Sequence, residues 1–101
     1  MLELDIERRL VSEVKKIKGL AWKFVSPGNR GVPDRIVILP DGKVIFIELK
    51  KPGEKPEPLQ EYRHQQLAKR GQQVYVIDTL AGVDDFIREV SQIREVSQNG
   101  V

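Results

Sequence analysis

The sequence predicts an α/β domain, with a mixed sheet of about four strands flanked by helices and followed by a C-terminal helix. Three observations predict this class. Apolar residues recur at helical spacing near the N-terminus and again over residues 81–96. Two β-branched runs, residues 35–39 and 44–50, are joined by Asp41-Gly42, a pair typical of hairpin turns. A Pro-rich connection then separates this hairpin from a further helix and strand, which gives the order α-β-β-β-α-β-α.

The first helix is expected over about residues 4–17, where apolar residues share one face and Gly19 follows as a stop signal. A strand is expected next over about residues 20–25, because its residues alternate with the period of a strand. It should end at Pro27-Gly28, and Trp22 on it is predicted to be core. The apolar residues that recur at helical spacing in the first helix are Ile6, Leu10, Val14 and Ile17, with Val11 beside them.

The elements after the hairpin are predicted mainly from their boundaries. Residues 52–58 are too rich in proline to be the interior of a helix or strand. A second helix is therefore expected over residues 59–70, stopped by Gly71. Residues 73–77 form a further strand, and residues 81–96 form the last helix, with one apolar stripe.

The composition is that of a globular protein with one modest core. The 101 residues are 40% hydrophobic and 32% charged, which excludes a disordered or fibrous chain and leaves room for one domain. Because there is no cysteine, a disulfide framework and a thiolate metal site are both excluded. No apolar run approaches the ~20 residues of a membrane span and no signal-peptide pattern opens the chain, so we expect no membrane partner and a cytoplasmic location.

Positive charge is concentrated in one segment. The net charge of the chain is only +2, a weak argument for a polyanionic partner. Residues 50–70, however, carry six basic and three acidic side chains. Any attraction for a polyanion is therefore local to this segment.

Three charged side chains are predicted to meet at one end of the hairpin. Side chains alternate faces along a strand, so Glu48 and Lys50 share a face. Asp34 opens the partner strand, and the antiparallel return of the hairpin brings it beside them. Taken alone, a Glu-x-Lys pattern is more often a solvated sheet face. Here the strand is apolar on both faces up to Glu48. A solvated sheet face therefore does not explain the charged residues at its end, which indicates a functional role.

These residue types suit metal-assisted hydrolysis of a phosphodiester, which requires an activated water and neutralisation of charge on the phosphoryl oxygens. Mg²⁺ prefers oxygen ligands, usually one or two carboxylates together with waters and substrate phosphates. We therefore predict Asp34 and Glu48 as metal ligands, with the carbonyl of Leu49 as an additional one. Lys50 would then orient or deprotonate the attacking water.

These residues and the segments around them match known sequence patterns. Pro33-Asp34 followed by Glu48-Leu49-Lys50 resembles the motif of the PD-(D/E)xK nuclease superfamily, whose core order is α-β-β-β-α-β with the active site across the second and third strands. Four longer segments together resemble the virus-type replication-repair nuclease (VRR-NUC) family, over roughly residues 5–80. They are Gly28-Asn29-Arg30-Gly31-Val32-Pro33-Asp34, Phe46-Ile47-Glu48-Leu49-Lys50-Lys51-Pro52-Gly53, Leu59-Gln60 and Gly71.

The resemblance implies one stand-alone nuclease domain over residues 1–101, of a type attached elsewhere to larger repair enzymes. It implies Mg²⁺ or Mn²⁺ at Asp34 and Glu48, Lys50 as the catalytic lysine, and Gln60 as the glutamine of the following helix. The sequence shows no departure at these positions.

The family pattern also includes an acidic residue on the first helix, and here two residues qualify. Glu7 shares the inward face of Leu10 and Val14, so we favour it as an outer ligand or metal-water contact. Glu3 lies one turn earlier, where the helix dipole by itself favours an acid.

On the second helix, Gln60, His64 and Leu67 share one face, which Leu67 should turn toward the sheet. Gln60 would then point toward the active end. His64 is interpreted as a surface or phosphate-contacting residue, because one histidine adds little to a Mg²⁺ site.

Basic residues flank the predicted centre and are candidates for phosphate contacts, although each one alone is more often solvated surface. These are Arg30, Arg35, Lys51 and Lys55.

The leading hypothesis is a Mg²⁺-dependent endonuclease acting on DNA. The resemblance implies a branched or junction substrate and a replication, repair or recombination setting in a phage or its bacterial host. Symmetric incision of two strands requires two centres, so we expect a homodimer whose interface involves the first or last helix. One alternative is a nucleic-acid-binding module with a vestigial nuclease centre, and another is a partner-binding α/β domain whose charges form surface pairs.

Overall fold

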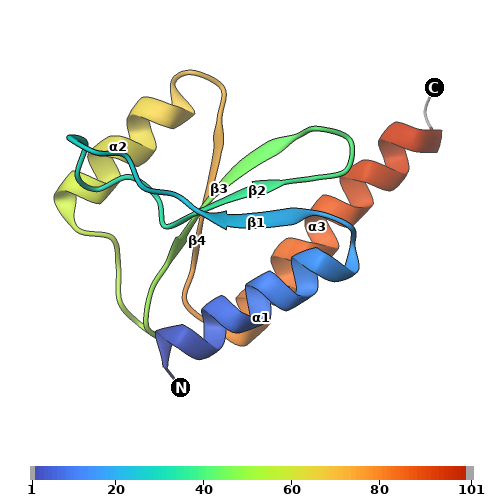
Figure 1. Cartoon of the computed structure of the whole chain (residues 1–101), viewed down its shortest axis with the longest axis horizontal. Helices are drawn as coiled ribbons and strands as arrows, with labels where there is room; N and C mark the ends of the chain where they lie inside the picture. The colour runs from blue at the N-terminus through green and yellow to red at the C-terminus, as the bar shows by residue number, and fades with distance from the viewer. Residues whose placement is uncertain (1, 100–101) are drawn as a thin grey trace.

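The computed structural model of the chain describes residues 2–99 and confirms the predicted order of elements (Figure 1). The predicted boundaries hold to within a few residues, except that the first strand is shorter and the last helix extends further. In chain order the elements are α1 (Glu3–Lys16), β1 (Leu20–Lys23), β2 (Arg35–Ile38), β3 (Val44–Leu49), α2 (Pro58–Ala68), β4 (Gln73–Ile77) and α3 (Leu80–Asn99).

The four strands form one mixed sheet in the order β1-β2-β3-β4. β1 pairs antiparallel with β2, and β2 pairs antiparallel with β3 across the turn at Asp41-Gly42. β3 and β4 are parallel, since α2 carries the chain back to the starting edge. The sheet is thus a three-stranded meander with one parallel strand added beside β3.

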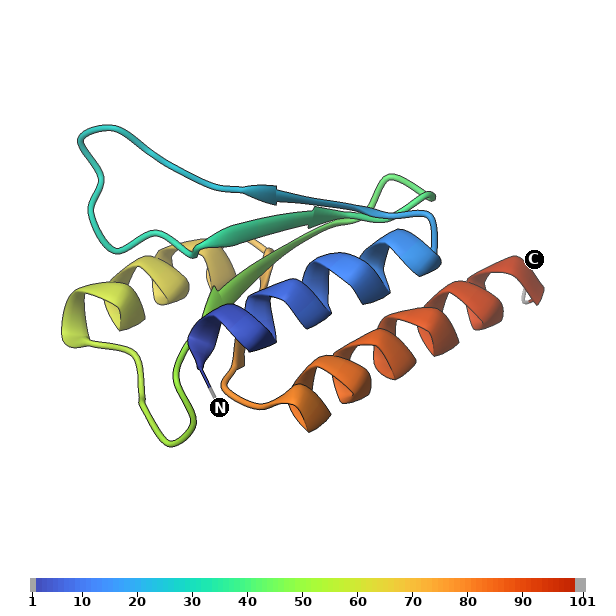
Figure 2. The ribbon, with the colours of Figure 1, turned by 60° about the horizontal axis from the view of Figure 1, so that its bottom comes forward.

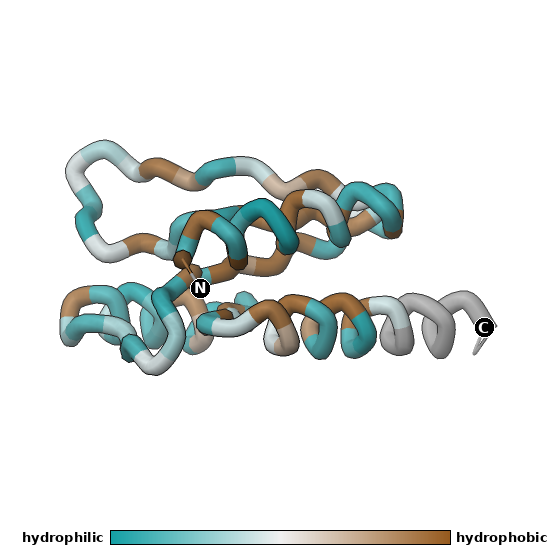
Figure 3. Tube along the Cα trace, turned by 90° about the horizontal axis from the view of Figure 1, so that it is seen from below, coloured by the Kyte–Doolittle hydropathy of each residue, from teal (hydrophilic) through white to brown (hydrophobic). Residues whose placement is uncertain are grey.

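One face of the sheet is covered by α1 and α3, which lie side by side beneath it (Figure 2). Apolar residues recur along both helices between polar ones (Figure 3), as expected for helices that bury one stripe. Arg9 on α1 and Asp84 on α3 are joined by a salt bridge of 2.9 Å. The core between these helices and the sheet consists of Ile6, Leu10, Val14, Val37, Leu39, Ile45, Ile47, Leu49, Ile77, Val83, Phe86 and Val90.

The opposite face is covered only in part, by α2 over the β3–β4 side. Trp22 lies on the uncovered side and is 57% exposed, so its predicted core position is wrong. The reason is that its neighbour Ala21 faces the helices and packs against the core, which turns Trp22 outward.

Within the described part of the chain, no helix is both long and apolar enough to cross a membrane.

Candidate active site

The β2–β3 pairing places Asp34 against the end of β3. Arg35 is registered opposite Ile47, so the residue before Arg35 lies beside Glu48 and Leu49. Asp34 Oδ2 accepts a hydrogen bond of 2.8 Å from the backbone N–H of Leu49. This bond fixes the Asp34 carboxylate at the end of β3, as the hairpin geometry predicts.

Glu48 lies on the sheet face that α2 covers, opposite to the face of Ile47 and Leu49. Its side chain is buried, with only 1% of the residue exposed. Two side chains of α2 reach it: Gln60 Nε2 donates to Glu48 Oε2 at 3.4 Å, and His64 Nε2 lies 3.3 Å from Oε1. The carboxylate therefore sits between the sheet and α2 with both oxygens contacted.

Burial raises the pKa of Glu48 to about 8, and a hydrogen bond with Asp34 and the negative charge of Asp34 add to this rise. The positive charge of Lys50 acts in the opposite direction. Burial also lowers the pKa of His64, so near neutral pH its ring is a neutral partner for Glu48. The ionised form of Glu48 thus lacks a cation strong enough to offset its desolvation.

Lys50 follows β3 directly and is half-buried. Its backbone N–H donates to the carbonyl of Ile77 at 3.0 Å, which continues the β3–β4 ladder by one residue. Its positive charge acts on Glu48, so the ammonium lies on the side of the site where this carboxylate is buried. The structure thus brings together the three residues at the centre of the prediction, Asp34, Glu48 and Lys50.

The first-helix acid that acts on Glu48 is Glu3, whose charge contributes to the raised pKa of Glu48. Glu7 is directed elsewhere: its Oε2 lies 3.5 Å from Nη2 of Arg35. The structure therefore does not bring Glu7 to Glu48, and of the two acids it favours Glu3. The cause is the packing of α1 against the sheet, which sets Glu7 against Arg35 at the start of β2.

The position of Arg35 also argues against its predicted contact with phosphate. It is 9% exposed, points to the helix-covered face, and donates from Nη1 to the carbonyl of Ala21 at 3.1 Å. Because Glu7 is the ion-pair partner of Arg35, the guanidinium charge is balanced within the fold. Arg30, Lys51 and Lys55 are exposed and remain available to a ligand.

Gln60 has two partners. Its Oε1 accepts from the backbone N–H of Glu57 at 2.9 Å, which caps the start of α2, while its Nε2 donates to Glu48. One side chain therefore ties the beginning of α2 to the buried carboxylate. His64 makes the second side-chain contact with Glu48, and this contact was not predicted. The four-residue spacing from Gln60 was the signal, because it places both side chains on one helix face.

The donor set fits a divalent cation. Within the described residues, no three Asp, Glu, His or Cys side chains are grouped so as to hold a metal by themselves. Two carboxylates, Asp34 and Glu48, are the usual protein contribution to a Mg²⁺ site, which is completed by waters, backbone carbonyls and phosphates. Glu48 in particular is a buried carboxylate beside another carboxylate, an arrangement that a bound cation would stabilise.

Comparisons with known proteins agree with this geometry. No family model matches the chain. A protein of Acyrthosiphon pisum secondary endosymbiont phage 1, named "Putative nuclease p44", is 61% identical over 77 residues, which cover 76% of this chain and 83% of the phage protein. A solved structure described as "VRR_NUC domain" superimposes with a TM-score of 0.81 and 33% identity, covering 85% of this chain and 94% of that one. The chain belongs to the virus-type replication-repair nuclease family and has its PD-(D/E)xK-like α/β core.

Proposed function

We propose that the protein is a metal-dependent nuclease that hydrolyses phosphodiester bonds of DNA at the site formed by Asp34, Glu48 and Lys50. The observation that carries this proposal is the burial of Glu48 against Asp34 at the end of the hairpin, with Lys50 beside them. A purely structural acid in that position would be costly, since its charge is desolvated and adjoins another carboxylate.

Asp34 and Glu48 would hold the cation, Mg²⁺ or Mn²⁺, with the carbonyl of Leu49 as a third oxygen from the chain. When bound, the ion supplies neutralisation of charge on the phosphoryl oxygens and acidifies a coordinated water. Whether one ion or two are used, the same two carboxylates take part.

The remaining residues prepare the site. Lys50 orients the attacking water through its ammonium or, in its neutral amine form, takes a proton from it, since its side chain is half-buried and its charge acts on Glu48. Gln60 and His64 hold the two oxygens of Glu48 in place through contacts of 3.4 and 3.3 Å. Glu3 contributes its charge from the start of α1 and takes the outer acidic role first assigned to Glu7.

The substrate is proposed to be branched or junction DNA, processed during replication, repair or recombination in a phage or bacterial cytoplasm. Family membership and the similarity to a phage protein support this setting. Arg30, Lys51 and Lys55 are exposed and are proposed to contact the DNA backbone.

A homodimer is proposed because one centre cuts one strand. The apolar stripes of α1 and α3, where described, are already buried in the core. The sheet face that carries Leu20 and Trp22, which are 47% and 57% exposed, is the better supported interface.

Cleavage of a matched panel of labelled single-stranded, duplex, flap and four-way-junction DNA in Mg²⁺ tests the proposal. Wild type is compared with Lys50→Ala and with Lys51→Ala, which removes the neighbouring exposed charge. Loss of general-base or positioning help should lower cleavage by Lys50→Ala at least about 100-fold with binding kept. Lys51→Ala should cut nearly as well as wild type.

If wild type binds the panel but cuts none of it in Mg²⁺ or Mn²⁺, the nuclease assignment is wrong. The protein would then be a nucleic-acid-binding module with a vestigial centre.

A further inference from the structure

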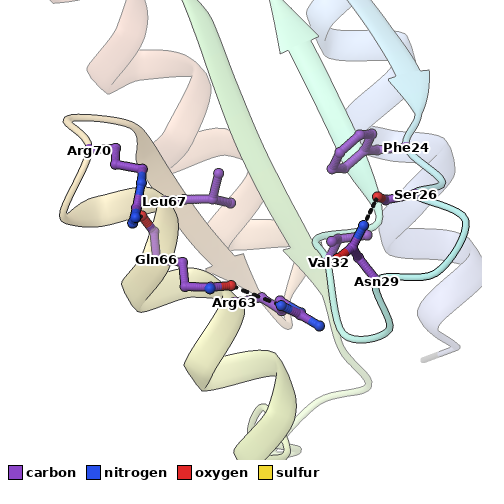
Figure 4. Close-up of a pocket in the computed structure, with 8 residues that line it drawn as sticks. All are labelled: Phe24, Ser26, Asn29, Val32, Arg63, Gln66, Leu67 and Arg70. Atoms are coloured by element: carbon purple, nitrogen blue, oxygen red, sulfur yellow. Dashed lines mark hydrogen bonds between the residues drawn. The ribbon is translucent and has the colours of Figure 1, made fainter.

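A cavity of about 320 Å³ lies between α2 and the segment that follows β1 (Figure 4). This volume is at the lower end of the ~300–1,000 Å³ of small-molecule sites, so it suits a ligand no larger than about one nucleotide. The segment contributes Phe24, Asn29 and Val32, while α2 contributes Arg63, Leu67 and Arg70 among others. Residues far apart in sequence therefore build it.

The inner wall of the cavity is apolar and includes an aromatic ring. In Figure 4, Phe24 and Leu67 extend into the space from opposite sides. The Phe24 ring is held by Phe46, with their centroids 5.6 Å apart. A planar ligand with a π-face would find a fixed ring to pack against.

The rim carries positive charge without acidic neighbours, because no Asp or Glu lines the cavity. Arg63 is anchored by donating from Nε to the carbonyl of Arg30 at 2.8 Å and from Nη1 to Gln66 at 3.0 Å. Arg70 is exposed and uses Nη1 for the carbonyl of Gln66. Two guanidinium groups beside an aromatic wall match a ligand that combines a phosphate with a base.

The cavity adjoins the candidate active site. Arg63 and Leu67 flank His64 on α2, and His64 contacts Glu48. From the sheet side, Phe24 packs on Phe46, which precedes Glu48 by two residues on the same face. Phe46 and Glu48 are about 7 Å apart along β3, so the aromatic wall of the cavity is one side chain removed from the strand position that precedes the buried carboxylate on its own face.

We propose that this cavity receives one unpaired nucleotide of the DNA strand next to the bond that is cut, with the base against Phe24 and a phosphate at Arg63 and Arg70. This inference rests on the proposed nuclease function and names the feature of the substrate that it selects. A base within an intact duplex is stacked and paired and cannot enter the cavity. The site therefore discriminates in favour of DNA with an unpaired nucleotide beside the cut.

The test couples a change in the DNA to a change in the cavity. A forked duplex is made with an abasic residue at each of the first unpaired positions in turn, and binding is measured by fluorescence anisotropy with EDTA present, so that nothing is cut. At one position the abasic residue should weaken wild-type binding about tenfold, the size expected for one base–aromatic contact. Phe24→Leu, which keeps an apolar side chain against Phe46, should bind the intact fork about tenfold more weakly and be insensitive to that abasic residue.

A second pair of variants removes charge at the exposed end of α2. Arg70→Ala should weaken binding of the fork clearly more than Lys69→Ala, which deletes an adjacent exposed cation that does not line the cavity. Both positions are exposed, so neither change threatens the fold.

The proposal is overturned if no abasic position affects wild-type binding, if Phe24→Leu stays as sensitive as wild type, or if Arg70→Ala and Lys69→Ala are equal. Cleavage in Mg²⁺ is measured separately. A wild type that binds as expected but does not cut would refute the nuclease function and leave the nucleotide site standing.

Discussion

Glu48 is the residue on which the proposed chemistry depends most directly. Its carboxylate is 1% exposed and is contacted by Gln60 and His64, neither of which brings a full positive charge at neutral pH. Asp34 adds negative charge and Lys50 offsets it only in part. The ionised side chain is thus stabilised less by its surroundings than by water, a cost in stability that the proposed cation would offset.

This balance predicts how stability depends on pH in the absence of metal. The pKa of Glu48 is about 8 in the folded protein and near 4.5 when unfolded. Its favourable contribution is therefore complete below pH 4.5, and the free energy of unfolding should fall as pH rises toward 8, by up to about 5 kcal/mol. Glu48→Gln, which cannot ionise, should lack this fall. Urea unfolding in EDTA between pH 4.5 and 9 measures it.

Bound metal should reverse the difference in stability between wild type and Glu48→Gln. At pH 8, adding Mg²⁺ should raise the midpoint of thermal unfolding of wild type and leave that of Glu48→Gln almost unchanged. Equal responses of both proteins would show that the cation is not held by Glu48.

Substitutions of the two acids of α1, Glu3 and Glu7, should have different effects on stability and on cleavage. Glu7→Gln leaves Arg35 partly buried without its ion-pair partner, so it should cost about 1–3 kcal/mol of stability while the folded protein still cuts DNA. Glu3→Gln should keep stability and reduce cleavage severalfold, because it removes the outer acidic group proposed for the metal site. Chemical denaturation and initial cleavage rates distinguish the two, and the opposite pattern would restore Glu7 as the first-helix acid.

At the scale of elements, α2 and the loop before β2 form one unit that positions the site. Gly31 packs against the first turn of α2: a Cβ there would lie 3.0 Å from the side chain and the carbonyl oxygen of Leu59. Arg63 fastens the same loop through the carbonyl of Arg30. The loop leads directly to Asp34, and α2 presents Gln60 and His64 to Glu48. Displacing one element would therefore disturb both carboxylates.

Two glycines of this loop allow a matched test of that coupling. Gly28 and Gly31 both have φ near +83°, but Gly28 has no atom within 4 Å of an added Cβ. Gly28→Ala should cost only the backbone strain of about 1–2 kcal/mol. Gly31→Ala should cost more and lower cleavage at least tenfold, because α2 must move. Circular dichroism melts and cleavage rates provide the readouts, and equal effects on cleavage would disprove the coupling.

At the scale of the whole molecule, the two faces of the sheet are unequal. α1 and α3 cover one face, whereas α2 covers only the β3–β4 side of the other. Leu20 and Trp22 are left exposed on the remaining part, which is an apolar surface on a strand at the edge of the sheet. A second copy of the chain would bury it.

Trp22 is the only tryptophan and reports on this face directly. If the proposed dimer uses the sheet face, tryptophan emission should shift to shorter wavelength as protein concentration rises, in parallel with the mass measured by sedimentation. Trp22→Glu should remain monomeric, because the dimer would bury an unpaired charge. A dimer that forms without any shift in emission would place the interface elsewhere, as on the helices first expected.

The order of the elements and the meeting of Asp34, Glu48 and Lys50 could be predicted from the sequence alone. Both depend on local rules. The alternation of side chains along β3 puts Glu48 and Lys50 on one face, and the tight Asp-Gly turn requires Asp34 to return beside them. The pattern of residues from Gly28 to Asp34 and from Phe46 to Gly53 was sufficient to indicate the family.

The surfaces that those elements cover became known only from the folded chain. Periodicity shows which residues share a face, but it does not show which face another element will bury. Glu3 acts on Glu48 and Glu7 pairs with Arg35 because of where α1 crosses the sheet. Trp22 is exposed because no helix covers its side of β1, and the cavity beside the site exists because α2 packs near a loop some 35 residues earlier in the chain. Such contacts are non-local, and no single segment of sequence encodes them.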